Sequence, residues 1–371
     1  MIRSDSTTSD RGLSSKYPWL TSTLAMVTLI SFMQDAASEL LYPLLPIFLT
    51  GVLAAPPVVL GVIEGCADAT AGVVRYLAGR LSDRYGRKRF IGAGYGIAAV
   101  GKIIVAAGIS WPMVLIGRVS DRLGKGLRSA PRDALISEST PEGYVGRAFG
   151  FHRSGDTLGA VLGPLLGLMA LALVNHDVRA AMWWAVIPGV IAALLTIFVR
   201  EPKHPERHPR RPQTIHSTAP LPKDFRRVVT LLALIALANF SDTLLLLRVL
   251  DLGFSTTEVV VAYVMFNFVY TCASYPAGAL SDRLPRQVVY SIGLLAFAVG
   301  YLGLGLVGKS PVVYVLVAVY GFFPAFTDGV GKAWISTLVA PEQLGRAHGV
   351  FQSISNGSVL VAGIWAGVMW N

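Results

Sequence analysis

The sequence has few of the residues from which disulfide frameworks and metal sites are built. Only two of its 371 residues are cysteines, Cys66 and Cys272, and both lie inside apolar segments, where a thiol packs as a small hydrophobic group. The six histidines are scattered, and four of them lie in loops: His176, His204, His208 and His216. We therefore expect neither a disulfide framework nor a metal site.

Motifs for catalysis and for nucleotide binding are also absent. The chain has no Gly-x-x-x-x-Gly-Lys-Ser/Thr loop, the motif with which many proteins bind nucleotide phosphates. Its apolar segments have neither a nucleophile spaced beside a base nor a cluster of metal ligands. The sequence therefore predicts a protein that is not an enzyme and that has no bound cofactor.

Charged residues are scarce, because 15% of the chain is charged and 53% is hydrophobic. A water-facing globule could not cover so many apolar side chains, so the composition indicates a polytopic membrane protein. A helix needs about 20 apolar residues to cross a bilayer, and segments of that length are too long for strands. We expect an all-α fold with eleven such segments, near residues 19–49, 56–80, 90–109, 111–137, 145–174, 179–199, 228–250, 255–280, 288–308, 311–338 and 345–371.

Acidic residues are the minority among the charges, with 22 against 32 lysines and arginines. The basic residues gather in loops that follow alternate segments, whereas the loops near residues 50–57, 108–112 and 251–258 have none. This alternation follows the positive-inside rule, which explains the net charge of +10 without nucleic-acid binding. We expect a multi-pass protein of the bacterial inner (cytoplasmic) membrane, with a cytoplasmic amino terminus and no cleaved signal peptide.

One stretch at the end of an apolar segment occurs twice. The sequence Gly79-Arg-Leu-Ser-Asp83-Arg84 recurs 199 residues later as Gly278-Ala-Leu-Ser-Asp282-Arg283. The same offset, without gaps, maps residues 134–137 onto 333–336 and residues 146–150 onto 345–349. The chain therefore encodes one bundle of helices twice.

The region between Arg200 and Lys223 is polar and rich in Pro, Arg and His, which is typical of a linker. We expect a cytoplasmic tail over residues 1–17, a first bundle over 18–199, a cytoplasmic linker over 200–227 and a second bundle over 228–371. The first bundle has six segments and the second has five, so the repeat predicts a twelfth helix that the sequence does not contain. Either the chain is truncated or its carboxyl terminus lies outside, and we favour truncation.

The doubled motif is the main point of resemblance to a known family. The pattern Gly79-x-Leu-x-Asp83-Arg84-x-Gly86-Arg87-Lys88, its weaker copy in the second half, the basic central loop and the two similar halves resemble the major facilitator superfamily. The resemblance covers nearly the whole chain. It implies two parallel bundles related about an axis along the membrane normal, with a cavity between them at the midplane.

By this resemblance, the two motifs form a gate at the cytoplasmic end. Asp83 would accept hydrogen bonds from N–H groups at the start of the last segment, near residues 343–346, and Asp282 from those near residues 143–147. The alternative is that the motifs are only positive-inside signals, but a topology signal needs neither Asp nor Gly. The predicted gate residues are Gly79, Asp83, Arg84, Gly86, Arg87, Arg147, Asp282, Arg283 and Arg346.

The fifth segment contains a second motif. Its sequence Gly159-Ala-Val-Leu-Gly163-Pro164-Leu-Leu-Gly167 resembles the antiporter signature of drug-efflux members of the superfamily, although Leu168 stands where a further glycine is usual. Glycines on one helix face permit close packing, and a proline bends the helix. The resemblance favours export. Ordinary packing of small residues is the alternative.

The repeat register shows where the two halves differ in charge. Each intramembrane charge costs about 2.5–3.5 kcal/mol or more at the bilayer centre unless it is paired or hydrated. A requirement of the fold should apply to both halves, so charges found only in the first half indicate function. Adding 199 pairs Glu64 with Tyr263, Asp68 with Asn267, Arg75 with Ser274, Lys102 with Tyr301, Arg118 with Val317, Arg153 with Gln352 and Asp156 with Ser355.

Two pairs of acidic residues in the first half are candidates for proton coupling. Asp35 and Glu39 share a helix face by their i, i+4 spacing, as do Glu64 and Asp68. Burial and a neighbouring carboxylate both favour the protonated form of a carboxyl group, and we place Asp35 and Asp68 first among the four. The alternative is that each acid is permanently paired with a basic side chain and only holds helices together.

The basic side chains of the first half indicate an anionic or zwitterionic cargo, unless they only balance the acids. Asp242 aligns loosely with Asp35 and is expected to face it across the cavity. Asp328 and Lys332, at i, i+4, are expected to pair with each other. The predicted substrate contacts are Arg75, Lys102, Arg118, Arg153, Asp156, Asp242 and Gln352.

These features together predict a proton-coupled secondary transporter that exports a small organic solute or drug by alternating access. The proton gradient supplies about 1.4 kcal/mol per pH unit and about 2.3 kcal/mol per charge for each 100 mV. Two alternatives stay open: a symporter that takes up an organic anion or metal chelate, and a membrane receptor that transports nothing. The expected partners are a small-molecule substrate, protons and the lipid bilayer, and we expect a monomer.

Overall fold

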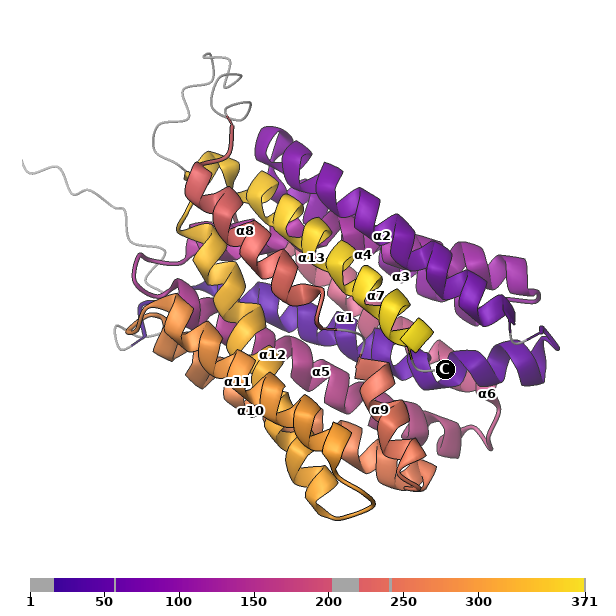
Figure 1. Ribbon diagram of the computed structural model, residues 1–371. Coiled ribbons are helices and arrows are strands. Elements are labelled where there is room, and N and C mark those ends of the chain that lie inside the picture. Colours follow the sequence, from indigo (N-terminus) through magenta and orange to yellow (C-terminus); the bar gives the residue numbers. More distant parts are fainter. Residues whose placement is uncertain (1–16, 57, 202–219, 240–241, 370–371) are drawn as a thin grey trace, which may run out of the picture.

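The computed structural model describes residues 17–56, 58–201, 220–239 and 242–369, and this part of the chain is helical with no strand. The all-α fold expected from the sequence is therefore confirmed. The α-helices are shown in Figure 1. Their bounds are α1 (Ser22–Ile47), α2 (Val58–Tyr85), α3 (Arg87–Ala106), α4 (Trp111–Ser139), α5 (Val145–Leu173), α6 (Val178–Trp183), α7 (Val186–Leu195), α8 (Lys223–Ala236), α9 (Asp242–Asp251), α10 (Thr256–Ser281), α11 (Arg286–Leu306), α12 (Val312–Ser336) and α13 (Leu344–Met369).

The expected segments correspond to these helices, with two of them divided. Segment six consists of α6 and α7 followed by a 3-10 turn, η2 (Thr196–Phe198), and segment seven consists of α8 and α9. A π-helical turn, η1 (Phe48–Val52), extends α1. Among the described residues, six helical stretches are long and apolar enough to cross a membrane. Helix α4 is not one of them, because it carries too many charged residues. Several of these charged side chains are buried inside the protein.

The 199-residue offset of the sequence is also an offset between helices. Helix α3 begins at Arg87 and α11 at Arg286, and α5 begins at Val145 and α13 at Leu344, so both pairs of starting points are 199 residues apart. The helices α1–α7 form one bundle and α8–α13 the other. The two bundles therefore repeat one helix order, as expected of parallel halves.

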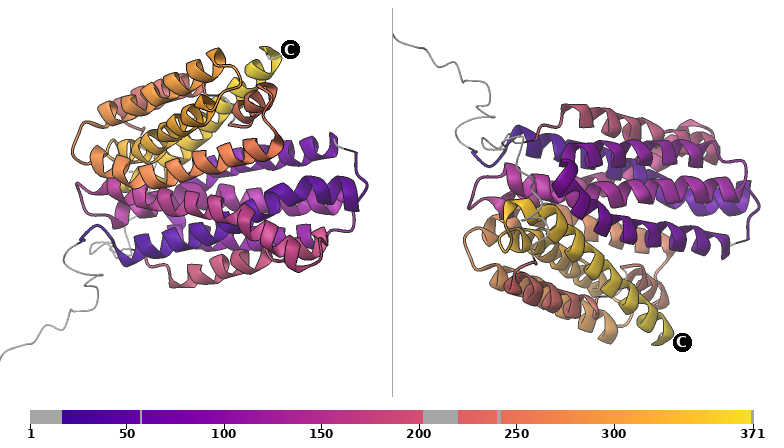
Figure 2. Two further views of the ribbon diagram at one scale, coloured as in Figure 1. Left: turned by 90° about the horizontal axis from the view of Figure 1, so that it is seen from below. Right: turned by 90° about the horizontal axis from the view of Figure 1, so that it is seen from above.

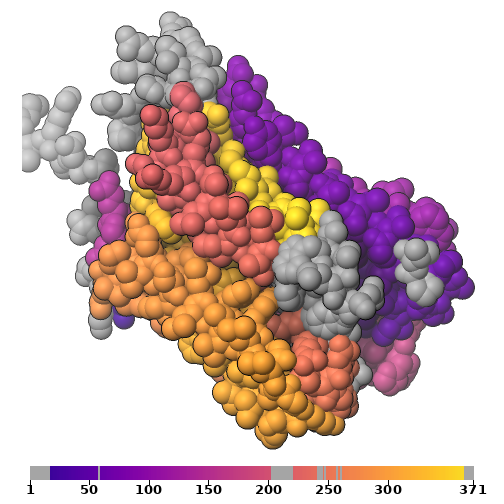
Figure 3. All heavy atoms as spheres, in the orientation of Figure 1, coloured from indigo at the N-terminus to yellow at the C-terminus, as the bar shows by residue number. Residues whose placement is uncertain are grey.

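The two bundles contact each other along two seams, α2 against α13 and α5 against α10. Figure 3 shows one of these seams, with α13 lying between α2 and α8 on the face in view. In the two views of Figure 2, the bundles lie against each other at one end and diverge toward the other. The end where they meet carries residues 82–87, 140–147, 281–286 and 337–346, and it is called the gate end below.

Glycines allow this close approach at the gate end. A Cβ atom added to Gly79 would overlap the carbonyl oxygen of Gly345 and lie 2.9 Å from the Cα of Gly349. On the other seam, a Cβ added to Gly278 would overlap the carbonyl oxygen of Gly146. Real Cβ atoms do not approach backbone this closely, so both seams require glycine. These glycines belong to the doubled motifs.

Candidate functional site

Helix α4 supplies most of the charge in the interior of the first bundle. It packs against both α2 and α3, and the carboxyl-terminal part of its buried face includes charged side chains of both signs. An isolated charge in a membrane interior is costly, so a helix of this composition needs partner charges on its neighbours. The buried charged residues of α4 are Arg118, Asp121, Arg128, Arg132 and Asp133.

Arg118 pairs with Glu64 across the α2–α4 contact. The guanidinium group donates three hydrogen bonds of 2.7–2.9 Å to the two carboxylate oxygens. Arg122, one turn further along α4, lies 3.7 Å from Glu64 and 3.4 Å from Asp68. The Asp68 side chain is 70% exposed. Glu64 therefore forms a bidentate pair with Arg118, whereas Asp68 has only the longer contact with Arg122 and a largely exposed side chain.

Lys102 pairs with Asp121 behind this group. The ammonium group lies 2.6 Å from the carboxylate, and both side chains are almost fully buried. Gln34 of α1 also approaches Asp121, at 3.4 Å. The sequence-based assignment of Lys102 to substrate binding stays a prediction, but in this conformation its ammonium group faces Asp121 and not open space.

The equivalent positions of the second bundle are filled by aromatic rings. Residues 199 positions after Lys102 and Asp121 are Tyr301 and Tyr320, whose ring centroids lie 5.4 Å apart. Phe297 extends the cluster, with its centroid 4.1 Å from that of Tyr301. One half therefore fills this space with an ion pair and the other with aromatic rings packed at a tilt. The charges found only in the first half therefore include at least one pair whose equivalent positions in the second half are filled by uncharged aromatic side chains.

Asp35 and Glu39 lie on α1, where α1 contacts α5. A Cβ added to Gly159 would lie 3.3 Å from the Cβ of Asp35, and one added to Gly163 would lie 2.7 Å from the Cβ of Glu39. The antiporter-like motif is thus the surface of α5 on which α1 rests, and Gly167 continues it against Leu40. Pro164 lies within α5 without ending it.

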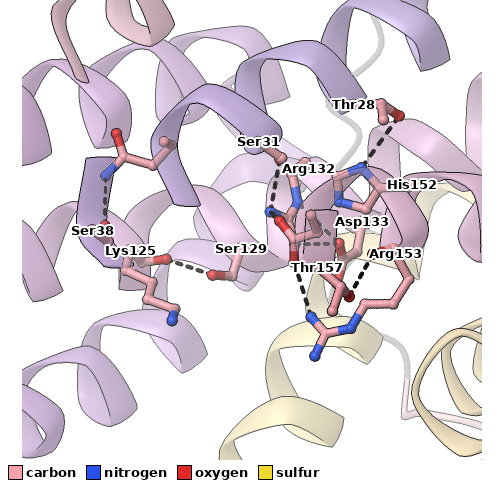
Figure 4. Close-up of polar contacts among 12 residues, drawn as sticks. Thr28, Ser31, Ser38, Lys125, Ser129, Arg132, Asp133, His152, Arg153 and Thr157 are labelled. Atoms are coloured by element: carbon pink, nitrogen blue, oxygen red, sulfur yellow. Dashed lines mark hydrogen bonds and ion pairs between the residues drawn. The ribbon is translucent and has the colours of Figure 1, made fainter. Parts of the chain in front are cut away.

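The two bundles are joined in the interior by a first set of contacts around Asp133, which is fully buried. Lys332 of α12 lies 2.8 Å from its carboxylate, and the amide of Gln352 in α13 donates to it at 2.7 Å. Arg132 lies 3.2 Å from the same carboxylate and donates to Ser31 at 3.1 Å, as Figure 4 shows. An acid of the first bundle is therefore held by two helices of the second.

A second set of contacts is centred on Arg153. Its guanidinium group lies 2.9 Å from Asp156 on its own helix and 2.9 Å from Asp328 of α12. The hydroxyl of Tyr270 contacts both Arg153 and Asp328. Asp328 and Lys332 were expected to pair with each other. That expectation is wrong, because each side chain reaches across to a charge of the other bundle.

Two buried histidines were not among the predicted site residues. The Nδ1 of His152 lies 3.5 Å from Thr28, a contact also drawn in Figure 4, and the Nε2 of His348 lies 3.0 Å from Ser336. His152 lies in α5 and His348 in α13. The sequence did contain a signal for both residues. Each histidine lies inside an apolar segment, where a polar side chain is expected to be buried and to need a hydrogen-bond partner.

The gate end contains both of the contacts implied by the family resemblance. The N–H groups of Gly345 and Arg346 donate to Asp83 at 2.9 and 2.7 Å, and those of Gly146 and Arg147 donate to Asp282 at 2.7 and 3.0 Å. Partial burial raises the pKa of the Asp282 carboxyl above its ordinary value, against the effect of these two donors. Each acid of one bundle therefore caps a helix of the other.

Arg87 adds a third link between the bundles. Its guanidinium group donates to the carbonyl oxygens of Ala134 and Pro341, both at 3.0 Å, and contacts Glu138. Gly86 precedes it with a φ of +92°, a conformation that favours glycine. Two of the other predicted gate arginines, Arg84 and Arg283, are exposed and therefore more peripheral.

The remaining predicted residues lie apart from these groups. Arg75 is buried on α2 near the seam with α13, and its Nε has no hydrogen-bond partner in the described part of the chain. Asp242 is the first residue of α9, but its side chain lies outside the described structure, so its predicted place opposite Asp35 stays a prediction.

Comparisons with known proteins agree on one family. The model of the Major Facilitator Superfamily matches residues 27–250 and 229–370. An uncharacterized MFS-type transporter of Methanocaldococcus jannaschii is 29% identical over 92% of this chain and 86% of its own. The class G tetracycline resistance protein of Vibrio anguillarum is 26% identical over 93% of both chains. The proton:xylose symporter XylE has the same fold, with a TM-score of 0.77, 16% identity and coverage of 97% of this chain and 90% of its own.

Proposed function

Because the chain belongs to the Major Facilitator Superfamily, whose members are transporters and not enzymes, we propose that it is a proton-coupled exporter of a small organic solute. The family membership expected from the motifs is confirmed by the match over both halves. Secondary transport by an integral membrane protein follows from it. The coupling ion, the direction and the cargo are the proposed part.

The observation that carries the proposal is the state of the acids in the first bundle. Among the described residues, Asp35 and Glu39 have no basic group within ion-pair distance and no hydrogen-bond donor. The other intramembrane acids of this bundle are paired, namely Glu64 with Arg118, Asp68 with Arg122, Asp121 with Lys102, Asp133 with Lys332 and Asp156 with Arg153.

An acid without a partner is the one that can exchange a proton at the lowest cost. Protonating a paired acid leaves a buried cation alone, whereas protonating Asp35 or Glu39 removes a charge that the membrane interior disfavours. Lys125 and Arg128 of α4 and Asp156 of α5 are the charged groups whose fields act on Asp35 from neighbouring helices. The geometry therefore favours Asp35 and Glu39 over Asp68 as proton carriers.

The accessible charges favour a cargo that has a positively charged group. Asp68 and Asp328 have side chains 70% and 41% exposed, whereas Arg118 is 3% exposed and already held by Glu64. An anionic group that binds Arg118 would have to displace Glu64, whereas the Nε of Arg75 has no hydrogen-bond partner among the described residues. The exposed carboxylates suit a positively charged group and Arg75 suits a negatively charged one, so we propose a zwitterionic solute, within the anionic or zwitterionic range that the sequence indicates.

Two features support export. The tetracycline resistance protein is similar to this chain over 93% of its length, and the antiporter-like glycines lie directly beneath the proposed proton carriers. The gate end is closed in this structure, and the positive-inside pattern indicates that this end faces the cytoplasm. The structure would then be an outward-facing state, in which an exporter releases cargo and accepts protons.

Transport in proteoliposomes tests this proposal, with tetracycline as the probe and pH gradients of both signs. We expect tetracycline to move against the proton flow, a result that does not depend on how the protein is oriented in the vesicle. Asp35→Asn and Glu39→Gln should abolish the response to the gradient but keep exchange of tetracycline without a gradient. Glu142→Gln, an exposed acid at the gate end, is the matched control and should behave as the wild type.

Three outcomes would count against the proposal. Movement of tetracycline with the protons would indicate the symporter alternative. Transport that ignores the gradient in the wild type would remove proton coupling, and a full gradient response in Asp35→Asn with Glu39→Gln would assign coupling to other residues. Exchange without a gradient shows in each case that the variant is folded.

A further inference from the structure

A cavity of about 420 Å³ lies at the gate end, on the outer side of the seam between α5 and α10. It is formed by both bundles and by the residues just before α1. The side chains important for its chemistry are Trp19, Tyr144, Arg147, Tyr275, Leu280 and Arg283. None of them belongs to the proposed proton or cargo site.

The cavity combines two guanidinium groups with a cluster of aromatic rings. Arg147 lies over the ring of Tyr144, 5.1 Å from its centroid, and only 3.9 Å separates it from Asp282. Both oxygens of Asp282 already accept backbone N–H groups, so this acid neutralises Arg147 only in part. Arg283 is exposed at the rim. The cavity therefore has the charge to bind an anion.

The position of the cavity identifies the environment of that anion. Helix α5 begins at Val145 and α10 ends at Ser281, so the cavity lies where the apolar helices end and the polar loops begin. Tyrosine and tryptophan are enriched at this depth, where the lipid headgroups lie. Tyr275 and Pro276, which are exposed, continue the cavity along α10 toward the apolar part of the helix.

We propose that this cavity binds the phosphate-bearing headgroup of an anionic phospholipid. Basic pockets between membrane helices favour such headgroups, because the guanidinium groups pair with the phosphate while the rings and the helix surface contact the glycerol and acyl parts. A free phosphate could pair with the guanidinium groups in the same way, but it has no glycerol or acyl part to contact the rings and the helix surface.

The site also joins the two bundles. Trp19 and Arg147 belong to the first bundle and Tyr275 and Arg283 to the second, and the rings of Trp19 and Tyr275 lie 5.4 Å apart. The cavity is complete only while the gate end is closed. A lipid that binds it therefore favours the closed gate end over the open one.

Lipid retention on the purified full-length protein, measured by native mass spectrometry, tests the site. Phosphatidylglycerol is the anionic probe and phosphatidylcholine the zwitterionic one. The double variant Arg147→Gln with Arg283→Gln should retain phosphatidylglycerol less well, by about fivefold for each arginine. Arg226→Gln with Arg227→Gln, two exposed arginines of α8, is the matched control and should match the wild type. Phosphatidylcholine retention should be the same in all of them.

Two further measurements distinguish a lipid phosphate from a free phosphate and allow for a variant that does not fold. Inorganic phosphate and glycerol 3-phosphate should not displace phosphatidylglycerol. Displacement by either compound would contradict lipid binding and would indicate a site for a free phosphate compound. Equal loss of phosphatidylglycerol in both double variants, or none in either, would overturn the site. If the Arg147→Gln variant does not fold, Arg283→Gln alone should show the fivefold loss, because that side chain is exposed.

Discussion

Replacing Gly278 with alanine is expected to force the gate end of the protein apart. The added Cβ would overlap the carbonyl oxygen of Gly146 and lie 3.0 Å from the Cα of Gly150. Both are backbone atoms of α5, so no side chain can turn away to make room. Overpacking of this kind costs about 1–3 kcal/mol, which shifts a two-state equilibrium about 5- to 150-fold.

The strain exists only while the seam is closed. At the gate end, α5 and α10 touch through Gly146 and Gly278, and a state in which this seam opens would relieve the contact without unfolding either bundle. The expected result is therefore a change in the population of states. The protein should remain folded.

Spin labels on either side of the seam measure this change. Glu142 and Leu284 are exposed and belong to different bundles, and labels there require Cys66 and Cys272 to be replaced by serine. We expect the distance distribution in Gly278→Ala to move to longer distances. Gly96→Ala is the matched control, because a Cβ at Gly96 of α3 meets nothing within 4 Å. The interpretation fails if the Gly278→Ala and Gly96→Ala distributions are the same.

Replacing Lys102 with methionine is expected to destabilise the first bundle by about 3–5 kcal/mol, the usual cost of removing one partner of a buried ion pair. The change leaves Asp121 in the bundle interior, where its closest other cation is Arg118 at 3.7 Å. Arg118 is already bound by Glu64 and is poorly placed to replace a contact of 2.6 Å.

The free energy of unfolding in bicelles, measured by steric trapping, checks this expectation. The double variant Lys102→Met with Asp121→Leu should recover most of the loss, because the second bundle fills the same positions with Tyr301 and Tyr320 and no charge. Lys223→Met, at the exposed start of α8, is the control and should change little. A double variant as unstable as Lys102→Met would mean that the pair does more than fill space.

The sequence predicted the helices and their order for a simple physical reason. A segment that crosses a bilayer must satisfy its own backbone hydrogen bonds, so a long apolar run leaves few choices besides a helix. The breaks in segments six and seven were not predicted, because both halves of each broken segment remain apolar. The division at residues 184–185 depends on local backbone geometry, which hydropathy does not record.

The partners of the charged residues were much less predictable. The spacing of Asp328 and Lys332 places both on one face of α12, and it led to the wrong expectation that they pair with each other. In the folded protein that face meets the other bundle, where Arg153 and Asp133 provide stronger partners. The repeat register marked Lys102 as a charge unique to the first half. It could not show that Lys102 would form a buried ion pair with Asp121.

The sequence by itself determined that this protein is a membrane-embedded bundle encoded twice, with its glycines and acids at equivalent ends of equivalent helices. These properties follow from composition, segment length and a constant offset, which are all local or periodic. Only the tertiary structure decided which acids are paired and which, like Asp35 and Glu39, have no partner in the part of the chain that the structure describes. Charge pairing depends on which helix faces meet across the two bundles, and residues far apart in the chain, such as Asp133 and Gln352, come together only when the bundles pack.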